Sequence, residues 1–291
     1  MSRPKRWRES AVVDGVCEVS LHQWRYFVEY IQQEMLDYPS YIWRGHRRID
    51  WLLESTFDRT ARRLGIASEK ISYLRYVHLK KFKSAVRGRR GANPPIPKDE
   101  NEWWTLGQHH GLSTPLLDWT TSPFVAAYFA FISEGTDTDR TPRRVVYALQ
   151  RHGIDSRASE IQVRLREEHR AKVEEMKAKG NHLVALAENF EVRPPVEFIS
   201  PMSDENARLV SQGGLFSRAP DGADLESWIR LNFKGSTKFA LIKITIPDKD
   251  RGEALKSLNR MNINHLSLFP DLYGASKFCN LALDLKRYAD L

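Results

Sequence analysis

The longest apolar run of the chain, residues 124–132, limits the folds that the chain can adopt. The run is about half as long as the roughly 18 apolar residues that a membrane span needs, so it predicts a buried helix in a protein that does not cross a membrane. Ser122 and Pro123 stand directly before it and suit the cap and the first turn of such a helix. The composition agrees with a buried core, since 41% of the 291 residues are hydrophobic and 28% are charged.

Patterns typical of helices and of strands follow one another along the rest of the chain without an internal repeat. Helical spacing of apolar residues, or a charged helix-favouring composition, predicts helices over residues 21–37, 71–86, about 159–179, about 251–261 and from Tyr273 onwards. Alternating or β-branched runs predict strands at residues 41–43, 144–149, 195–199, 209–210 and 239–246. The order is not the regular βαβα order of a doubly wound sheet, and the chain has no Gly-x-Gly-x-x-Gly turn. We therefore expect an α+β fold.

The expected organisation is a single mixed α/β domain over residues 20–291, with a basic N-terminal segment at 1–19 and a charged helical insertion at about 158–180. The basic start of the chain leads into Trp7 and Arg8 instead of an apolar signal core. The only two cysteines, Cys17 and Cys279, lie far apart, which disfavours both a disulfide framework and a zinc site. A cytoplasmic protein without a bound metal is expected.

The formal net charge of +8 is unevenly distributed. Six basic residues crowd one short stretch: Lys80, Lys81, Lys83, Arg87, Arg89 and Arg90. Such a cluster can neutralise phosphates and release counterions, which would make it a nucleic-acid contact. The alternative is a solvated helix face that binds nothing.

Three polar motifs interrupt the apolar pattern, and the first is Trp43-Arg44-Gly45 at the end of a predicted strand. An arginine there offers a rigid fork of donors for phosphate or carboxylate, and the glycine allows a ligand to approach the backbone. A surface arginine in a turn is the alternative.

The second motif, residues 108–120, reads Gln-His-His-Gly-Leu-Ser-Thr-Pro-Leu-Leu-Asp-Trp-Thr. If His109 and His110 are on a strand, they point to opposite faces, so they do not readily chelate one metal ion. Asp118 and Thr120 flank Trp119 just before the buried helix, where they can meet a ligand or cap the helix. Capping accounts for one or two of these residues but not for the whole motif.

The third motif, residues 206–216, reads Asn-Ala-Arg-Leu-Val-Ser-Gln-Gly-Gly-Leu-Phe. Its glycine pair suggests a sharp turn, and a period of two would put Arg208 and Gln212 on one face of a strand. An edge strand with a purely structural role is the alternative.

Together these motifs resemble the FRG-domain family, which is named for a Phe-Arg-Gly motif. The resemblance rests on Trp-Arg-Gly at 43–45, the whole 108–120 motif, Ser-Pro-Phe-Val-Ala-Ala-Tyr-Phe-Ala at 122–130, Asn-x-Arg-x-x-x-Gln-x-Gly-x-Phe at 206–216, and Leu-Phe-Pro-Asp-Leu-x-Gly at 268–274. It extends from about residue 20 to the C-terminus. Ser113-Thr114-Pro115 stands where the family usually has Pro-Thr-Arg, which removes one basic contact from the expected pocket.

The layout of these motifs also resembles that of ADP-ribosyltransferases, with an Arg-Gly strand end, a hydroxyl-bearing strand before a helix, an apolar strand and a final strand that carries a glutamate. By this resemblance Arg44, Gly45, Gln108, His109 and Trp119 would bind NAD. The catalytic roles would fall to Asp118, Thr120, His110, Arg208 and Gln212. At the position of the glutamate the chain has Asn206 and Arg208. Glu205 is adjacent, but on a strand its side chain would point to the opposite face.

Three functions are compatible with these features. The first is an NAD-dependent ADP-ribosyltransferase that modifies a polyanionic acceptor, RNA or DNA, as in bacterial toxin or phage-defence systems with a partner or antitoxin protein. The second is a binding module for a nucleotide or nucleic acid that lacks turnover, which the absent glutamate favours. The third is a nuclease that relies on His109 and His110, since no carboxylate cluster suits magnesium.

Overall fold

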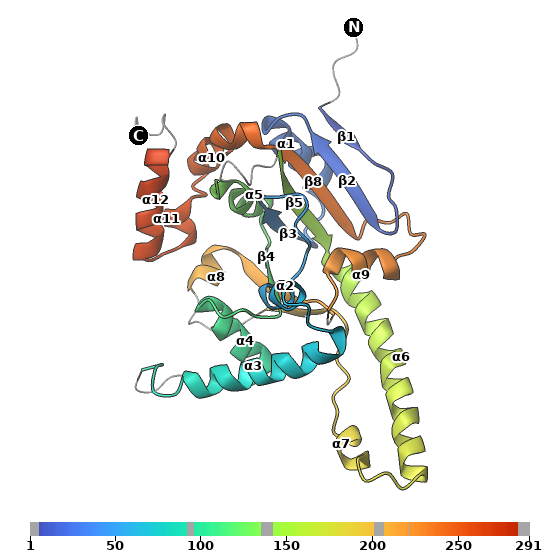
Figure 1. The fold of residues 1–291 in the computed structure, drawn as a ribbon. Coiled ribbons are helices and arrows are strands. Elements are labelled where there is room, and N and C mark those ends of the chain that lie inside the picture. The colour runs from blue at the N-terminus through green and yellow to red at the C-terminus, as the bar shows by residue number, and fades with distance from the viewer. Residues whose placement is uncertain (1–5, 92–95, 135–141, 201–206, 221, 285–291) are drawn as a thin grey trace.

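The computed structural model describes residues 6–91, 96–134, 142–200, 207–220 and 222–284. They form a single α+β domain around one eight-stranded mixed sheet, whose strand order is β1-β2-β8-β5-β3-β4-β7-β6 (Figure 1). The strands are β1 (Trp7–Glu9), β2 (Val16–Leu21), β3 (Tyr41–His46), β4 (Leu116–Thr120), β5 (Arg143–Gln150), β6 (Glu197–Ile199), β7 (Gly214–Arg218) and β8 (Leu241–Pro247). Neighbouring strands are antiparallel except β2 and β8, which are parallel.

Helices cover both faces of this sheet. The α-helices are α1 (Arg25–Tyr30), α2 (Thr56–Arg63), α3 (Ile71–Ala85), α4 (Glu100–His109), α5 (Pro123–Ile132), α6 (Arg151–Ala178), α7 (Val184–Glu188), α8 (Ala207–Ser211), α9 (Leu225–Asn232), α10 (Arg251–Arg260), α11 (His265–Leu268) and α12 (Leu272–Asp284). None in the described parts of the chain is long and apolar enough to cross a membrane.

Side-chain alternation along the strands divides the core into layers. On one face Trp43 and Ile244 pack with α1, α5 and α10. On the other face Ile42 and Leu149 pack with the start of α6 and with α9. A third, smaller cluster joins α3 and α4 to β4 and β7 through residues that include Trp104.

The sheet opens between β3 and β4. Six consecutive residue pairs join β3 to β5, and five join β4 to β7. In contrast, only Trp43 and Thr120 are paired between β3 and β4. The two halves of the sheet therefore separate beyond this pair, next to the N-terminal half of α5.

Several predicted elements are confirmed. The apolar run is α5, and Ser122 Oγ caps it by accepting a hydrogen bond from the Val125 amide at 3.3 Å. The predicted helix at 71–86 is α3, and the strands at 144–149 and 239–246 are β5 and β8. The charged insertion is the helix α6, which begins earlier than predicted and projects from the body of the protein, with α7 near its far end (Figure 1).

The prediction of one helix over residues 21–37 is wrong at its start. Leu21 ends β2, Ser20 pairs with Thr245 of β8, and regular helix begins at Arg25. Leu21 is buried with Cys17 and Val19, so this segment has the period of a strand and not that of a helix. Residues 1–19, expected to be a separate basic segment, contribute β1 and most of β2 to the sheet.

The prediction of a strand at residues 209–210 is also wrong, because α8 occupies 207–211 and a strand begins only at Gly214. Two apolar residues carry no detectable period, and here Leu209 packs against the small cluster beneath β7. Asn206 and Glu205, considered for the position of the glutamate, lie outside the described residues.

Gly45 has a packing role that the sequence did not predict. A Cβ atom at this position would lie 1.9 Å from the carbonyl oxygen of Ala126 and 2.7 Å from the amide nitrogen of Ala130. The glycine therefore allows α5 to lie directly on β3.

We expect Gly45→Ala to lower the free energy of unfolding by about 2 kcal/mol or more, because the new methyl group meets rigid helix backbone. Urea denaturation followed by circular dichroism measures this change. Gly252→Ala is the control, since nothing lies within 4 Å of its Cβ position in α10 and alanine there should stabilise by up to about 1 kcal/mol. Equal stabilities for wild type and Gly45→Ala would contradict the packing role.

Candidate functional site

A pocket of about 320 Å³ lies where β3 and β4 separate. The strands β3 and β4, the helix α5 and two residues from later in the chain contribute to its wall. The lining residues are Trp43, Arg44, Gly45, Asp118, Trp119, Thr120, Ala126, Phe129, Gln212 and Phe269. The pocket thus brings together parts of all three polar motifs and of α5.

The Arg44 side chain bridges the opening in the sheet. Its Nη1 donates a hydrogen bond of 2.6 Å to the Asp118 carbonyl oxygen and lies 3.5 Å from the Asp118 carboxylate. Its Nε donates to Nε2 of His46 at 2.8 Å. Burial lowers the pKa of the Arg44 guanidinium, and the nearby Asp118 opposes this shift. An arginine remains charged even so, so the pocket wall carries a fixed cation.

His46 supports Arg44 from the buried side of β3. Its side chain is 6% exposed, and its Nε2 accepts the Arg44 hydrogen bond, so the ring is the neutral tautomer with its proton on Nδ1. Burial lowers the pKa of His46 well below the usual value, and the charges of Arg44 and Arg59 lower it further. A protonated ring would lose the Arg44 contact and add a second cation beside it.

The Asp118 carboxylate is held in place by a relay of side chains. Gln108 Nε2 donates to both carboxylate oxygens at 3.0 Å, and Gln108 Oε1 accepts a hydrogen bond from the hydroxyl of Thr114. Thr114 is fully buried, which fixes the orientation of the Gln108 amide, whereas the Asp118 side chain is 58% exposed. The carboxylate is therefore both oriented and accessible.

Thr120 and Trp119 of β4 are held by hydrogen bonds to neighbouring segments. The Thr120 hydroxyl donates to the Gln212 carbonyl oxygen at 2.6 Å and accepts from the Ser122 amide at 3.1 Å. Trp119 is buried, and its Nε1 donates to Ser217 Oγ at 2.8 Å. Both side chains line the pocket while their polar atoms are engaged within the protein.

The sequence predicted that Arg208 and Gln212 share one face of a strand, and this is wrong, because Arg208 lies in α8 and Gln212 in the turn that follows it. Gln212 lines the pocket, and its Nε2 donates to the Leu268 carbonyl oxygen at 3.2 Å. Arg208 is not among the lining residues; it forms an ion pair with Asp271 and lies over the rings of Phe269 and Tyr273 at 5.4 and 5.5 Å. Arg208 therefore fixes the turn that carries the pocket residue Phe269.

The segment that contributes β3, α4, β4 and α5 is also the part of the chain that matches a known family. A family model described as FRG domain matches residues 39–139. This chain contains an FRG domain. The match covers fewer residues than the motif resemblance found in the sequence, which extends from about residue 20 to the C-terminus. Comparison with curated proteins and with solved structures gives no significant match.

Two histidines of the FRG domain lie away from the pocket. His109 is the last residue of α4 and His110 caps its C-terminus, so the expected strand is wrong here. Their rings meet edge to face at 4.9 Å, and neither lines the pocket. Within the described ranges, no group of three or more His, Cys, Asp or Glu side chains could hold a metal ion.

The basic cluster of the FRG domain lies on and just after α3. Lys83 and Arg90 both lie over the ring of Trp103, at 5.4 and 5.6 Å, and Lys80 lies 5.9 Å from the ring of Tyr76. Lys80, Lys81 and Arg87 are exposed. None of these cations lines the pocket at the sheet opening, so the cluster is a separate surface.

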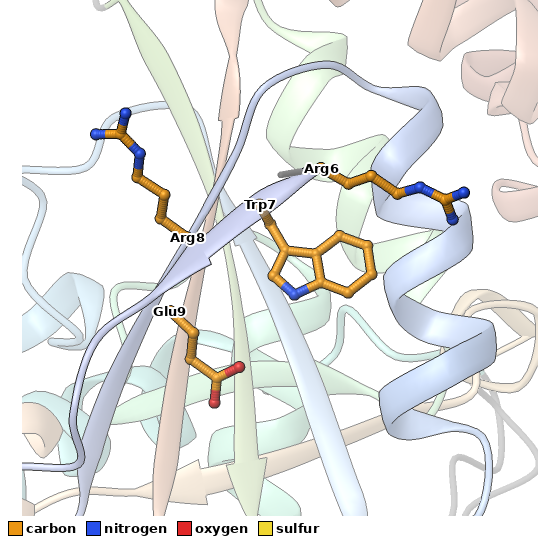
Figure 2. Close-up of a pocket in the computed structure, with 4 residues that line it drawn as sticks. All are labelled: Arg6, Trp7, Arg8 and Glu9. Atoms are coloured by element: carbon orange, nitrogen blue, oxygen red, sulfur yellow. The ribbon is translucent and has the colours of Figure 1, made fainter. Parts of the chain in front are cut away.

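Two other hollows lie away from the three polar motifs. One lies beside β1, where Figure 2 shows the side chains of Arg6, Trp7, Arg8 and Glu9 pointing in different directions. There Trp7 packs edge-on against Tyr30. The second hollow, a cleft of about 750 Å³, lies between α3 and α6.

Four residues that sequence reasoning did not select belong to the site or support it: His46, Thr114, Phe129 and Phe269. Phe269 lies in the Leu-Phe-Pro-Asp segment that carried part of the family resemblance, and Thr114 lies inside the second motif. Phe129 looks like an ordinary core residue of an apolar helix. His46 has no sequence signal beyond its place two residues after Arg44 on the same strand face.

The burial of neutral His46 predicts a loss of stability in acid. The unfolded chain binds a proton at this residue below about pH 6.5, whereas the folded protein does not until the pH is well below that value. Stability is therefore complete above about pH 6.5 and falls as the pH is lowered towards the folded-state pKa, by at most about 1.4 kcal/mol per pH unit for one proton.

We expect His46→Gln to lose less stability than wild type between about pH 7 and pH 5.5, because glutamine keeps an acceptor for Arg44 but does not titrate. Urea denaturation at several pH values gives the two slopes. Identical slopes would show that His46 does not control the acid response.

Proposed function

We propose that the pocket binds NAD and that the protein is an ADP-ribosyltransferase with a polyanionic acceptor. The observation that carries this proposal is the adjacency of β3, β4 and β7. In the ADP-ribosyltransferase layout these strands correspond to the arginine strand, the hydroxyl strand and the final strand. Here the pocket lies between the first two strands, with Arg44 and Thr120 on its wall, and Gln212, two residues before β7, lines it as well.

The size and the lining of the pocket suit one ring and one ribose of a dinucleotide. Its volume of about 320 Å³ is near the lower end of the roughly 300–1,000 Å³ range of ligand pockets. Four aromatic residues, Trp43, Trp119, Phe129 and Phe269, contribute to the wall and can pack against a planar ring. The phosphates of the dinucleotide would then lie towards Arg44, the only cation in the lining of the described pocket.

The chemistry assigned to the pocket is the exchange of one glycosidic bond for another. NAD supplies the bond between ribose C1′ and the nicotinamide nitrogen; that bond breaks with its electron pair leaving on nicotinamide, and an acceptor heteroatom forms the new bond to C1′. Asp118 carries the only carboxylate among the described lining residues. Its negative charge would stabilise the positive charge that develops on the ribose and take the proton of the acceptor.

Gln212 lies between α8 and β7, two residues before the strand begins, and it lines the pocket. A neutral amide can hydrogen-bond a ribose hydroxyl, but it provides no negative charge. The proposal therefore moves the charged role from the final strand to Asp118, across the pocket on β4.

A second candidate function is a nucleotide-binding module without turnover. Two contacts favour it: the Asp118 carboxylate is already bound by Gln108, and the Gln212 amide donates to Leu268. The third possibility, a nuclease, gains no support from His109 and His110, which do not line the pocket.

Incubation of the purified protein with NAD labelled in the adenylate moiety, together with RNA, DNA and cell lysate, tests the proposal. Transfer of label to an acceptor supports an ADP-ribosyltransferase. Saturable NAD binding without transfer supports the binding module, and cleavage of nucleic acid without NAD supports the nuclease.

We expect Asp118→Asn to reduce turnover by at least about a hundredfold, because the charge is lost while the shape is kept. NAD affinity and thermal stability should change little, since asparagine still offers an oxygen to Gln108. Turnover, calorimetric affinity and melting temperature are measured on one preparation. Wild-type turnover in the folded variant would remove Asp118 from the mechanism.

The α3 surface generates a separate prediction. If Lys80 and Lys81 contact phosphates, the double variant Lys80→Glu/Lys81→Glu should bind nucleic acid with a weaker salt dependence. The slope of log affinity against log salt should fall in magnitude by about one to two. Lys234→Glu/Lys238→Glu is the matched control, with the same charge change at two exposed lysines near β8. A slope equal to that of the control would mean that the α3 cluster is only a solvated face.

A further inference from the structure

A second basic surface is linked to the pocket through His46, whose ring contacts the ring of Trp51. It is formed by the loop after β3 and by α2, residues 47–63, and we name it the loop–α2 surface. This segment contains the five arginines 47, 48, 59, 62 and 63 and three acidic residues. Asp58, one of the three acids, is buried and paired with Arg75 of α3. The other two acids pair with arginines of the segment, Asp50 with Arg48 and Glu54 with Arg62, so the exposed part of the segment keeps a net positive charge.

Arg59 connects this surface to the pocket. Its charge lowers the pKa of both Arg44 and His46. Arg62 on the same helix is held by Glu54, with contacts of 2.6 and 3.0 Å. Arg59 and Arg63 have no hydrogen-bond or ion-pair partner among the described residues, and both are exposed.

Trp51 adds an aromatic face to these cations. Its side chain is 42% exposed, and its ring lies 6.1 Å from the ring of His46. The guanidinium of Arg47 lies 5.2 Å from the indole centroid. Two apolar neighbours, Ile49 and Leu52, are exposed to a similar extent, at 40% and 43%. Trp51 thus lies between Arg47 and His46, the residue that supports Arg44.

We propose that the loop–α2 surface binds single-stranded nucleic acid as the acceptor of the reaction in the pocket. An exposed ring beside arginines is typical of single-strand recognition, where bases stack on aromatic side chains and phosphates follow the cations. A duplex keeps its bases stacked on one another and offers none to Trp51. The inference names the acceptor and therefore rests on the proposed function.

The test uses a fluorescent oligouridylate of about 12 nucleotides and fluorescence anisotropy in the absence of NAD. We expect Trp51→Ala to weaken binding about tenfold, and Trp51→Phe to keep most of it, because phenylalanine retains a stacking face. Arg59→Gln should lower the salt slope by about 0.7, the value for one phosphate contact on a single strand.

Matched controls separate these effects from general surface changes. Phe239→Ala removes a ring of the same exposure, 42%, from a distant loop, and Lys234→Gln removes one exposed charge; both should bind like wild type. Melting temperatures confirm that each variant is folded, and calorimetry should give an unchanged NAD affinity for Trp51→Ala.

Three results would overturn the inference: no binding of the oligonucleotide by wild type, equal affinities for Trp51→Ala and Phe239→Ala, or loss of NAD affinity in Trp51→Ala with oligonucleotide binding intact. The last would assign the surface to the dinucleotide. Because binding is measured without NAD, failure of label transfer with intact oligonucleotide binding would count against the proposed function alone.

Discussion

The hydrogen bond from Arg44 to the Asp118 carbonyl oxygen is the interaction on which the site depends. Where two strands separate, their backbone groups lose their ladder partners, and a buried polar group without a partner is costly. Arg44 gives one of these carbonyl groups a charged donor, so the sheet can open without leaving it unsatisfied. The same contact puts a permanent cation on the wall of the space that the opening creates.

A guanidinium in a partly buried position also limits its neighbours. Its desolvation is offset by hydrogen bonds and by the nearby Asp118 carboxylate, and the ring that accepts its Nε hydrogen must stay neutral. Gln108 of α4 and Thr114 orient the Asp118 carboxylate, which lies on the neighbouring strand β4. Opposite charges are therefore fixed 3.5 Å apart on the wall of one pocket before any ligand arrives, an arrangement that reduces the reorganisation needed for charged chemistry.

The sequence predicted those parts of the fold that have a long and consistent period. The helix at α5, its Ser122 cap and the strand at β5 have such patterns, and the 43–45 and 118–120 motifs do meet at one pocket. The errors fall on short segments, where two or three apolar residues fit either period, as at Leu21 and Leu209. The pocket itself could not be predicted, because it depends on how β3 and β4 separate and on Phe269, which is distant in sequence.

The span that matches the FRG family and the unit that folds are not the same. Residues 39–139 contain β3 and β4, which share a single residue pair. The longer ladders that hold each strand in place come from β5 and β7, both outside the span. Gln212 and Phe269 complete the pocket wall from still later in the chain. A fragment cut at the family boundaries would carry the recognisable motifs but would lack the two strands that hold them apart.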